Sequence, residues 1–372
     1  MNKLNKYAFS NLYDIASGIS TTKTQAGHGT AFVSFSTVFN NIFLPDELPD
    51  LMETSEQEQE TYSIRKGDIL ITRTSETADE LAMSCVALKE YPGATYSGFV
   101  KRLRPKTIGV AYDKFMAFFL RSKYFRKVIN NNTIMTLRAS FNEDMFSFLT
   151  LYLPDYDVQI KVGDLLYNIE CKIQNNKRIN DNLAQQAQLL FDFMFQDISG
   201  NKHIGEFIVP QRGTALLSKN AIPGDVPVVA GGLEPATYHN AANTVAPVIT
   251  ISSSGANAGF VNLWGVPVWS SDSSFIDFKM TPHIYFWYAL LKRHQNNIYK
   301  IQTGSAQPHI YPSHIASLPI CDLNFEKVAD YTERVTPLFA LIAKNYKESN
   351  QLRALRDWLL PMLMNGQATI SD

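Results

Sequence analysis

The sequence predicts an α+β protein in which two β-rich domains alternate with two long helices that pair as an antiparallel coiled coil. Three observations predict this class. A ladder of apolar residues with helical period occurs twice, short apolar runs broken by turn residues precede each ladder, and the order of these elements is the same in both halves of the 372-residue chain. We therefore expect an internal repeat with pseudo-twofold symmetry.

The two ladders lie 169 residues apart and share a pattern, apolar towards the ends and polar in the middle. Polar residues in a helix–helix seam cost stability but fix register, so Asn176, Asn180, Asn345 and Ser349 are predicted register residues. Two helices that each bury their stripe in a separate bundle are the alternative. The ladder positions are Leu166, Ile169, Ile173, Asn176, Asn180, Leu183, Ala187, Leu190 and Met194, then Val335, Leu338, Ile342, Asn345, Ser349, Leu352, Arg356, Leu359 and Leu363.

Each predicted helix has about 34 residues and a length of roughly 50 Å. The first has no glycine or proline between Asp164 and Gln196, whereas Pro337 and Pro361 fall inside the second. Because proline removes a helical hydrogen bond, a kink or a late start is expected there.

Upstream of each ladder the pattern changes to strands and turns. Residues 68–72 and 247–251 are the clearest strands, short helices are expected at about 113–128 and 283–293, and Pro154 and Pro319 mark extended segments that lead into the long helices. The predicted domains are residues 1–155 (first β-rich domain), 156–197 (central long helix), 198–320 (second β-rich domain) and 321–372 (C-terminal long helix).

Each clear strand is followed by a polar loop. Small hydroxyls and glycine suit phosphate contacts, while Arg and Asn suit bidentate contacts with bases; a polar turn without such a role is the alternative. The candidates in these loops are Thr72, Arg73 and Thr74 in the first half, and Ser252, Ser253, Ser254 and Asn257 in the second.

A second polar locus follows each short helix. Here we match Ala139-Ser140 with Ser305-Ala306, and the candidates are Arg138 and Ser140, then Thr303, Gly304, Ser305 and Gln307. The net charge is −1, but residues 99–142 hold ten Lys and Arg and a single acid, Asp113. A local basic field attracts phosphates whatever the net charge, so Lys101 and Arg102 join the candidates; a solvated basic surface is the alternative.

Motifs for catalysis are missing. The sequence has no GxxxxGK[ST] or GxGxxG loop, no HExxH, no GxSxG and no Pro-Pro dipeptide, so no catalytic residue and no metal site are predicted. Three scattered cysteines, the lack of an N-terminal apolar signal segment and the lack of a membrane-length apolar run lead us to expect a cytoplasmic protein with no membrane partner.

Five segments together resemble a known family, the DNA specificity subunits of Type I restriction–modification systems. They are GDILITR (67–73), VITISSSGANAG (248–259), PVWSSD (267–272), QTGSAQP (302–308) and LLPMLMNG (359–366). Their order and duplication carry the resemblance, which covers nearly the whole chain and is clearer in the second half. The first half departs from it, because residues 75–80 are acidic where the second half has a Ser-Gly-Ala loop.

The resemblance implies two target-recognition domains, each reading one half of a split site in double-stranded DNA, with the helices setting the distance between half-sites. It implies docking of two DNA methyltransferase (modification) subunits and a restriction/translocase subunit. S-adenosylmethionine, ATP and Mg²⁺ are then expected in those partners, and this chain is expected to bind no cofactor. The alternatives are a nuclease or methyltransferase with an unrecognised site, and a coiled-coil scaffold that does not bind DNA.

Overall fold

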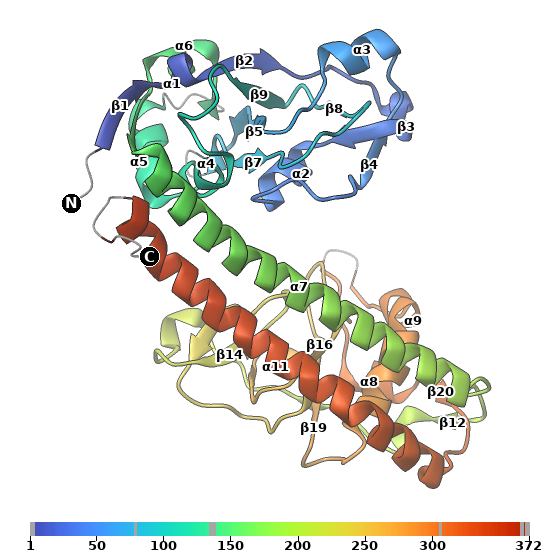
Figure 1. Cartoon of the computed structure of the whole chain (residues 1–372). Helices are drawn as coiled ribbons and strands as arrows, with labels where there is room; N and C mark the ends of the chain where they lie inside the picture. Colours follow the sequence, from blue (N-terminus) through green and yellow to red (C-terminus); the bar gives the residue numbers. More distant parts are fainter. Residues whose placement is uncertain (1–3, 78–79, 134–138, 305–306, 365–367, 369–372) are drawn as a thin grey trace. The chain divides into compact units, whose positions relative to one another are not determined.

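The computed structural model describes residues 4–77, 80–133, 139–304, 307–364 and 368 (Figure 1). The chain forms two compact units. Unit 1 comprises Met1–Ile173 and Gln351–Asp372, and unit 2 comprises Gln174–Asn350. Each unit holds one β-rich domain and part of both long helices, so the predicted division into four separate segments does not coincide with these units.

Unit 1 contains a four-stranded sheet in the order β2-β9-β5-β7, a three-stranded sheet in the order β4-β3-β8, and two-stranded pairs β1-β11 and β6-β10. The strands are β1 (Leu4–Ala8), β2 (Tyr13–Ser17), β3 (Ala26–Val33), β4 (Asp50–Met52), β5 (Ile69–Thr72), β6 (Thr74–Ser75), β7 (Ser84–Val86), β8 (Thr95–Tyr96), β9 (Val100–Pro105), β10 (Ala139–Ser140) and β11 (Thr150–Pro154). The short helices are α1 (Phe9–Leu12), η1 (Lys23–Gln25), α2 (Phe35–Asn40), α3 (Glu56–Thr61), α4 (Asp113–Phe119), α5 (Lys123–Asn132) and α6 (Glu143–Phe148).

Unit 2 contains a four-stranded sheet in the order β13-β19-β16-β17, a three-stranded sheet in the order β15-β14-β18, and the pair β12-β20. Its strands are β12 (Lys202–His203), β13 (Gln211–Arg212), β14 (Val226–Val229), β15 (Thr237–His239), β16 (Val248–Ser252), β17 (Val261–Trp264), β18 (Trp269–Ser270), β19 (Ser273–Asp277) and β20 (Pro319–Ile320). Its short helices are η3 (Ile204–Glu206), η4 (Ser218–Asn220), α8 (Ile284–Arg293), α9 (Gln295–Lys300) and α10 (Pro312–Ala316).

The two strand plans are the same. In each four-stranded sheet the strands, numbered in chain order, lie in the spatial order first, fourth, second, third. In each three-stranded sheet the central strand pairs antiparallel with one neighbour and parallel with the other (β3 with β8, β14 with β18). The expected α+β class is therefore confirmed, and the repeat predicted from the ladders extends through both β-rich domains.

Two long helices follow the domains, α7 (Tyr156–Met194, 39 residues) and α11 (Phe325–Met364, 40 residues). Each is longer than the ladder that predicts it. Both prolines lie inside α11, so the expected late start at Pro337 is wrong. Next to this proline, the Thr336 hydroxyl donates to the Thr332 carbonyl at 2.7 Å.

Apolar residues of both long helices, including the ladder residues Leu166, Val335 and Leu363, are buried against the domains as well as against each other. In unit 1, Val162 and Leu166 of α7 and Leu363 of α11 belong to the core around Phe115 and Phe119. In unit 2, Phe191 of α7 and Tyr331 and Val335 of α11 pack with Phe286 of α8. The local burial considered as an alternative and the pairing of helices therefore occur together.

The four polar ladder residues, which we call the polar seam, are buried in unit 2 where α7 and α11 run antiparallel. Asn345 Nδ2 donates to Asn180 Oδ1 at 2.8 Å, and Asn176 Nδ2 donates to Glu348 Oε2 at 2.7 Å and to Ser349 Oγ at 3.3 Å. In unit 1 the helices are joined by an ion pair between Arg356 Nη1 and Glu170 Oε2 at 2.7 Å.

The short helices differ from expectation at one place. The single helix expected at about 113–128 is two helices, α4 and α5, because Ser122 breaks the run and caps the second: its hydroxyl accepts from the Phe125 N–H. Within the described parts of the chain, neither long helix nor any other is apolar enough over a sufficient length to cross a bilayer.

Candidate nucleic-acid interface

In unit 1 the two polar loci predicted from the sequence lie side by side. β5 ends at Thr72, and the residues that follow form β6, which pairs with β10: Thr74 faces Ser140, and Ser75 faces Ala139. The Phe141 N–H donates to the Arg73 carbonyl at 2.7 Å. The loop after the strand and the segment after the short helix thus form one surface.

Unit 2 repeats this arrangement. The Ile310 N–H donates to the Ser253 carbonyl at 3.0 Å, Gly255 N–H donates to the Pro308 carbonyl at 3.1 Å, and Ser254 forms a bridge with His309. Ser253 therefore occupies the place of Arg73, and Ile310 that of Phe141. We call the two surfaces, at the ends of β5 and β16, the candidate interfaces of unit 1 and unit 2.

The predicted match between Ala139-Ser140 and Ser305-Ala306 is wrong. The hydrogen bonds place Pro308-His309 opposite Ser254, as Ala139-Ser140 lies opposite Thr74 and Ser75. A pair of small residues carries too little information to set a register, whereas the backbone hydrogen bonds define it. Arg138 and Ser305, both predicted contacts, lie outside the described residues.

Several predicted contacts are exposed or half-exposed at these interfaces. In unit 2 the loops need backbone conformations that favour glycine, at Gly255 (φ 80°) and Gly304 (φ 94°). The residues concerned are Arg73, Thr74 and Ser140 in unit 1, and Ser254, Asn257, Thr303, Gly304 and Gln307 in unit 2.

Three predicted contacts are buried instead. The Thr72 side chain is fully buried, and its hydroxyl accepts from the Met83 N–H at 2.9 Å. Ser252 and Ser253 are 4% and 1% exposed. The prediction that these side chains are exposed was wrong because side chains alternate between the two faces of a strand. A hydroxyl at the end of a central strand therefore faces the protein interior as readily as solvent. Because they are buried, these three side chains do not belong to the candidate interfaces.

The basic run of residues 99–142 is largely internal. Lys101 is 6% exposed, and its Nζ donates to Ser17 Oγ at 2.9 Å and lies 3.3 Å from Glu143. Arg102 donates to the Ser63 carbonyl at 2.6 Å, and burial lowers its pKa. The expectation that these two cations contact phosphate is therefore corrected, because each already has an internal partner.

The same holds for three more arginines of this run. Arg104 Nη2 pairs with the fully buried Asp68 at 2.6 Å, a contact that raises the pKa of Arg104. Arg121 donates to the carbonyls of Val38, Phe39, Asn41 and Ser84, and Arg126 donates to those of Leu81 and Ala82. In contrast, Lys123 and Lys127 are exposed.

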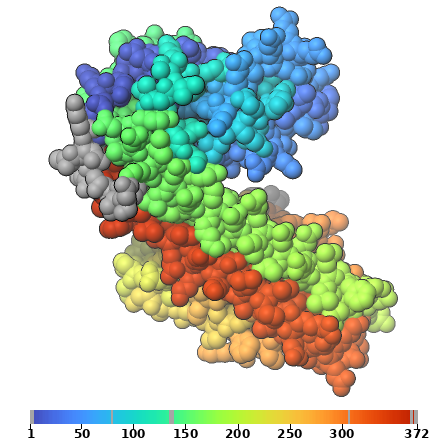
Figure 2. Space-filling model, in the orientation of Figure 1, coloured from blue at the N-terminus to red at the C-terminus, as the bar shows by residue number. Residues whose placement is uncertain are grey.

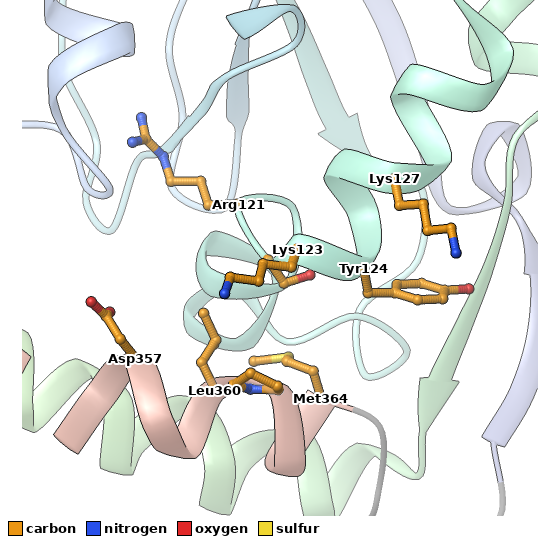
Figure 3. A pocket seen from close by; sticks show the side chains of 9 residues that line it. Arg121, Lys123, Tyr124, Lys127, Asp357, Leu360 and Met364 are labelled. Atoms are coloured by element: carbon orange, nitrogen blue, oxygen red, sulfur yellow. The ribbon is translucent and has the colours of Figure 1, made fainter. Parts of the chain in front are cut away.

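These two lysines line an open cavity of about 500 Å³ in unit 1, drawn in Figure 3. Lys123 and Tyr124 come from α5, and Leu360 and Met364 come from α11. Arg121 also borders the cavity, but Figure 3 shows its guanidinium directed away from α11. The α5 wall of the cavity thus carries cations, whereas the α11 wall combines the apolar Leu360, Pro361 and Met364 with the carboxylate of Asp357.

Sequence reasoning missed two groups at the interfaces. Phe99 is 61% exposed beside Arg73, whose N–H donates to the Phe99 carbonyl at 2.8 Å. In unit 2, Arg212 Nη2 donates to Asp272 Oδ1 at 2.8 Å, and the Ser254 hydroxyl donates to the other oxygen of Asp272. Arg212 and Asp272 are 60 residues apart, so only the fold brings them together.

No group of three or more His, Cys, Asp or Glu residues suited to hold a metal ion occurs in the part of the chain that the structure describes. The three cysteines are free thiols, and Cys85 is buried. The exposed residues of the candidate interfaces offer hydrogen bonds from guanidinium, hydroxyl, amide and backbone groups.

Comparison with known proteins supports the resemblance seen in the sequence. No family model matches the chain. The Type I restriction enzyme HindI specificity subunit of Haemophilus influenzae is 27% identical over 170 residues, which is 45% of this chain and 35% of that protein. The match thus spans about a third of the relative's length.

The fold is also found in a solved structure. The crystal structure of a Type I restriction–modification system S subunit from M. genitalium aligns with a TM-score of 0.60 at 16% identity, over 100% of this chain and 97% of that one. The HsdS subunit from Thermoanaerobacter tengcongensis aligns with a TM-score of 0.39 at 13% identity, over 98% of this chain and 97% of that one, too low to add to the argument. The expected resemblance to specificity subunits is confirmed, and the shared fold is established.

Proposed function

We propose that this chain is the non-catalytic DNA specificity subunit of a Type I restriction–modification complex. Each unit reads one half of a split site in double-stranded DNA through its candidate interface. The observation that carries the proposal is the repeated strand plan, because both copies end in the same pair of loops and expose hydrogen-bonding side chains there. The similarity to specificity subunits supports it.

The proposal is tested by replacing one residue at each interface, Arg73→Ala in unit 1 and Asn257→Ala in unit 2. The methylated motif is then read by sequencing the methylome of a host that carries the chain and its partner genes. Each change is expected to relax base preference in one half of the motif only, since a lost base contact costs about 1–3 kcal/mol at its own position.

If either variant lost base preference equally in both halves of the motif, the proposal that each unit reads its own half-site would be contradicted. Purified chain given S-adenosylmethionine, Mg²⁺ and plasmid is expected neither to methylate nor to cleave, because the proposal assigns S-adenosylmethionine, ATP and Mg²⁺ to the partners. It also assigns to α7 and α11 the spacing between the half-sites, so a change in helix length should alter the spacer and leave the half-sites unchanged.

The long helices carry exposed apolar residues suited to partner docking. Leu189 of α7 is 60% exposed and Trp358 of α11 is 64% exposed, and the two are equivalent under the 169-residue offset. Each has an exposed apolar neighbour three or four residues away on its helix, Phe193 and Leu355. In Figure 2 both helices show an outer face at the molecular surface. The two equivalent exposed positions, Leu189 and Trp358, support docking of two methyltransferase subunits, with a translocase–nuclease subunit joining the complex.

Trp358→Ala is expected to weaken binding of a methyltransferase subunit by about 2 kcal/mol, roughly 30-fold in Kd, because a buried interface tryptophan is a frequent hot spot. Titration of the chain with purified methyltransferase subunit measures this. Phe148→Ala is the matched control, since Phe148 is an exposed aromatic of α6 in the same unit (81% exposed). Equal affinity of the Trp358 variant and the wild type would place the docking surface elsewhere.

A further inference from the structure

In unit 2 the carboxylate of Asp272 forms hydrogen bonds with side chains of two other segments near the candidate interface. Asp272 precedes β19 and accepts hydrogen bonds from Arg212 at the end of β13 and from Ser254 just after β16. Arg212 and Asp272 keep side-chain exposures of 46% and 37%. The guanidinium is thus held in place at the surface without being buried.

Exposed ion pairs contribute little to folding stability. The Arg212–Asp272 pair instead limits the conformations of a long side chain. Arginine has five N–H donors, and the hydrogen bond to Asp272 uses one of them. A guanidinium that is already oriented loses less conformational entropy when it binds, so its remaining donors are well suited to a ligand with two neighbouring acceptors.

The equivalent positions of unit 1 show that the shared fold does not need this group. Arg212 pairs with Ser274 across the sheet, whereas Ser17 pairs with Lys101 at the equivalent place in unit 1. The position of Asp272 is taken by Phe99. Basic and hydroxyl residues are thus exchanged between paired strands, and the carboxylate is replaced by an aromatic ring, while the sheet order stays the same.

The Arg212–Asp272 pair differs between two copies of one scaffold, is exposed, and lies beside the loop that follows β16, which are the properties of a specificity determinant. We propose that Arg212, oriented by Asp272, reads a guanine in the half-site bound by unit 2. Guanine presents O6 and N7 as neighbouring acceptors in the major groove, the pattern that a guanidinium matches with two donors. Asp272 is a positioning residue, and the inference rests on the proposed function.

The test uses the complex of the full chain with its partner methyltransferase subunits, and a library of duplex DNA with randomised positions. The unit 2 half-site is defined as the half that Arg73→Ala leaves unchanged. The wild type is expected to prefer guanine at one position there by roughly 5- to 100-fold over other bases. Arg212→Ala should reduce this preference to below roughly threefold and leave the other positions unchanged.

Variants of Asp272 distinguish a role in orienting Arg212 from a role in stabilising the fold of unit 2. Asp272→Ala should lower the guanine preference at the same position. Asp272→Asn keeps one acceptor oxygen for Arg212 and presents an amide N–H that can donate to the Ser254 hydroxyl, so it should restore most of the preference. Arg334→Ala is the control, because Arg334 has the same kind of exposed partner, Asp330 at 2.8 Å, on α11. Melting curves of all variants should match that of the wild type.

Two outcomes would overturn the inference while leaving the proposed function in place. One is an unchanged guanine preference in Arg212→Ala. The other is a uniform loss of affinity across all sequences, which would identify Arg212 as a phosphate contact. A wild-type complex that selects no sequence at all would instead refute the proposed function, and the inference with it.

Discussion

Arg121→Ala is expected to lower the free energy of unfolding of unit 1 by about 3–5 kcal/mol. The guanidinium donates to the carbonyls of Ser84, Val38, Phe39 and Asn41 at 2.6–3.0 Å, and burial lowers its pKa. Each buried acceptor left without a donor costs about 1–3 kcal/mol, and water entering the vacated space can satisfy some of them. Denaturant unfolding measures the loss, and hydrogen exchange should show faster opening of α2 and β7.

Lys123→Ala is the matched control, because Lys123 is an exposed cation two residues away. Its effect on stability should stay within about 0.5 kcal/mol. Comparing the Arg121→Ala and Lys123→Ala variants also distinguishes an internal structural role of Arg121 from a role in phosphate contact. If Arg121 contacted phosphate, its removal would reduce the salt dependence of DNA binding and leave unit 1 as stable as the wild type. That result would contradict the internal role seen in the structure.

The basic run shows where sequence reasoning stops. Ten cations in 44 residues resemble a phosphate-binding surface, and charge density says nothing of where each side chain ends. Arg104 reaches the buried Asp68, which lies 36 positions earlier, and Arg121 reaches the carbonyls of residues 38–41, some 80 positions away. Such partners are set by strand order, which no local pattern contains.

Local periodicity succeeded where one face of an element is buried. The long helices were predictable because their ladders keep a constant face over many turns, and β5 and β16 because a short run of branched residues is bounded by polar turns. The late start predicted at Pro337 was wrong because α11 is packed along its length. A packed helix tolerates the loss of one backbone hydrogen bond, whereas the same loss would end an isolated helix.

At the candidate interfaces, the loops were predictable but not the side chains that matter within them. Arg212 sits in a strand of two residues with no periodic signal. One weak signal did exist: Gly18 and Gly213 each follow an equivalent strand, and a Cβ at either position would lie 2.2–2.5 Å from backbone oxygen atoms. Matching the repeats on these glycines would have aligned Ser17 with Arg212 and drawn attention to the difference.

Asn345→Ala is expected to lower the free energy of unfolding of unit 2 by about 1–3 kcal/mol, because it leaves the buried amide of Asn180 without its partner. Leucine at both positions should recover much of this loss, since an apolar pair leaves no group unsatisfied. Denaturant unfolding of the two single leucine variants and the double variant should therefore show a coupling energy of about 0.5–3 kcal/mol. Asn182→Ala, an exposed asparagine of α7 two residues from Asn180, is the control.

Additive effects of the two leucines would show that the polar seam does not act as a pair. A seam selected for stability alone would hold apolar residues, yet this one buries four polar side chains, and Asn176 Oδ1 finds no hydrogen-bond partner among the described residues. The hydrogen bond between Asn345 and Asn180 forms in only one alignment of the two helices, whereas a pair of leucines can pack in many alignments. Under the proposed function, in which α7 and α11 set the spacing between half-sites, the double leucine variant should be stable but should read its DNA spacer less strictly.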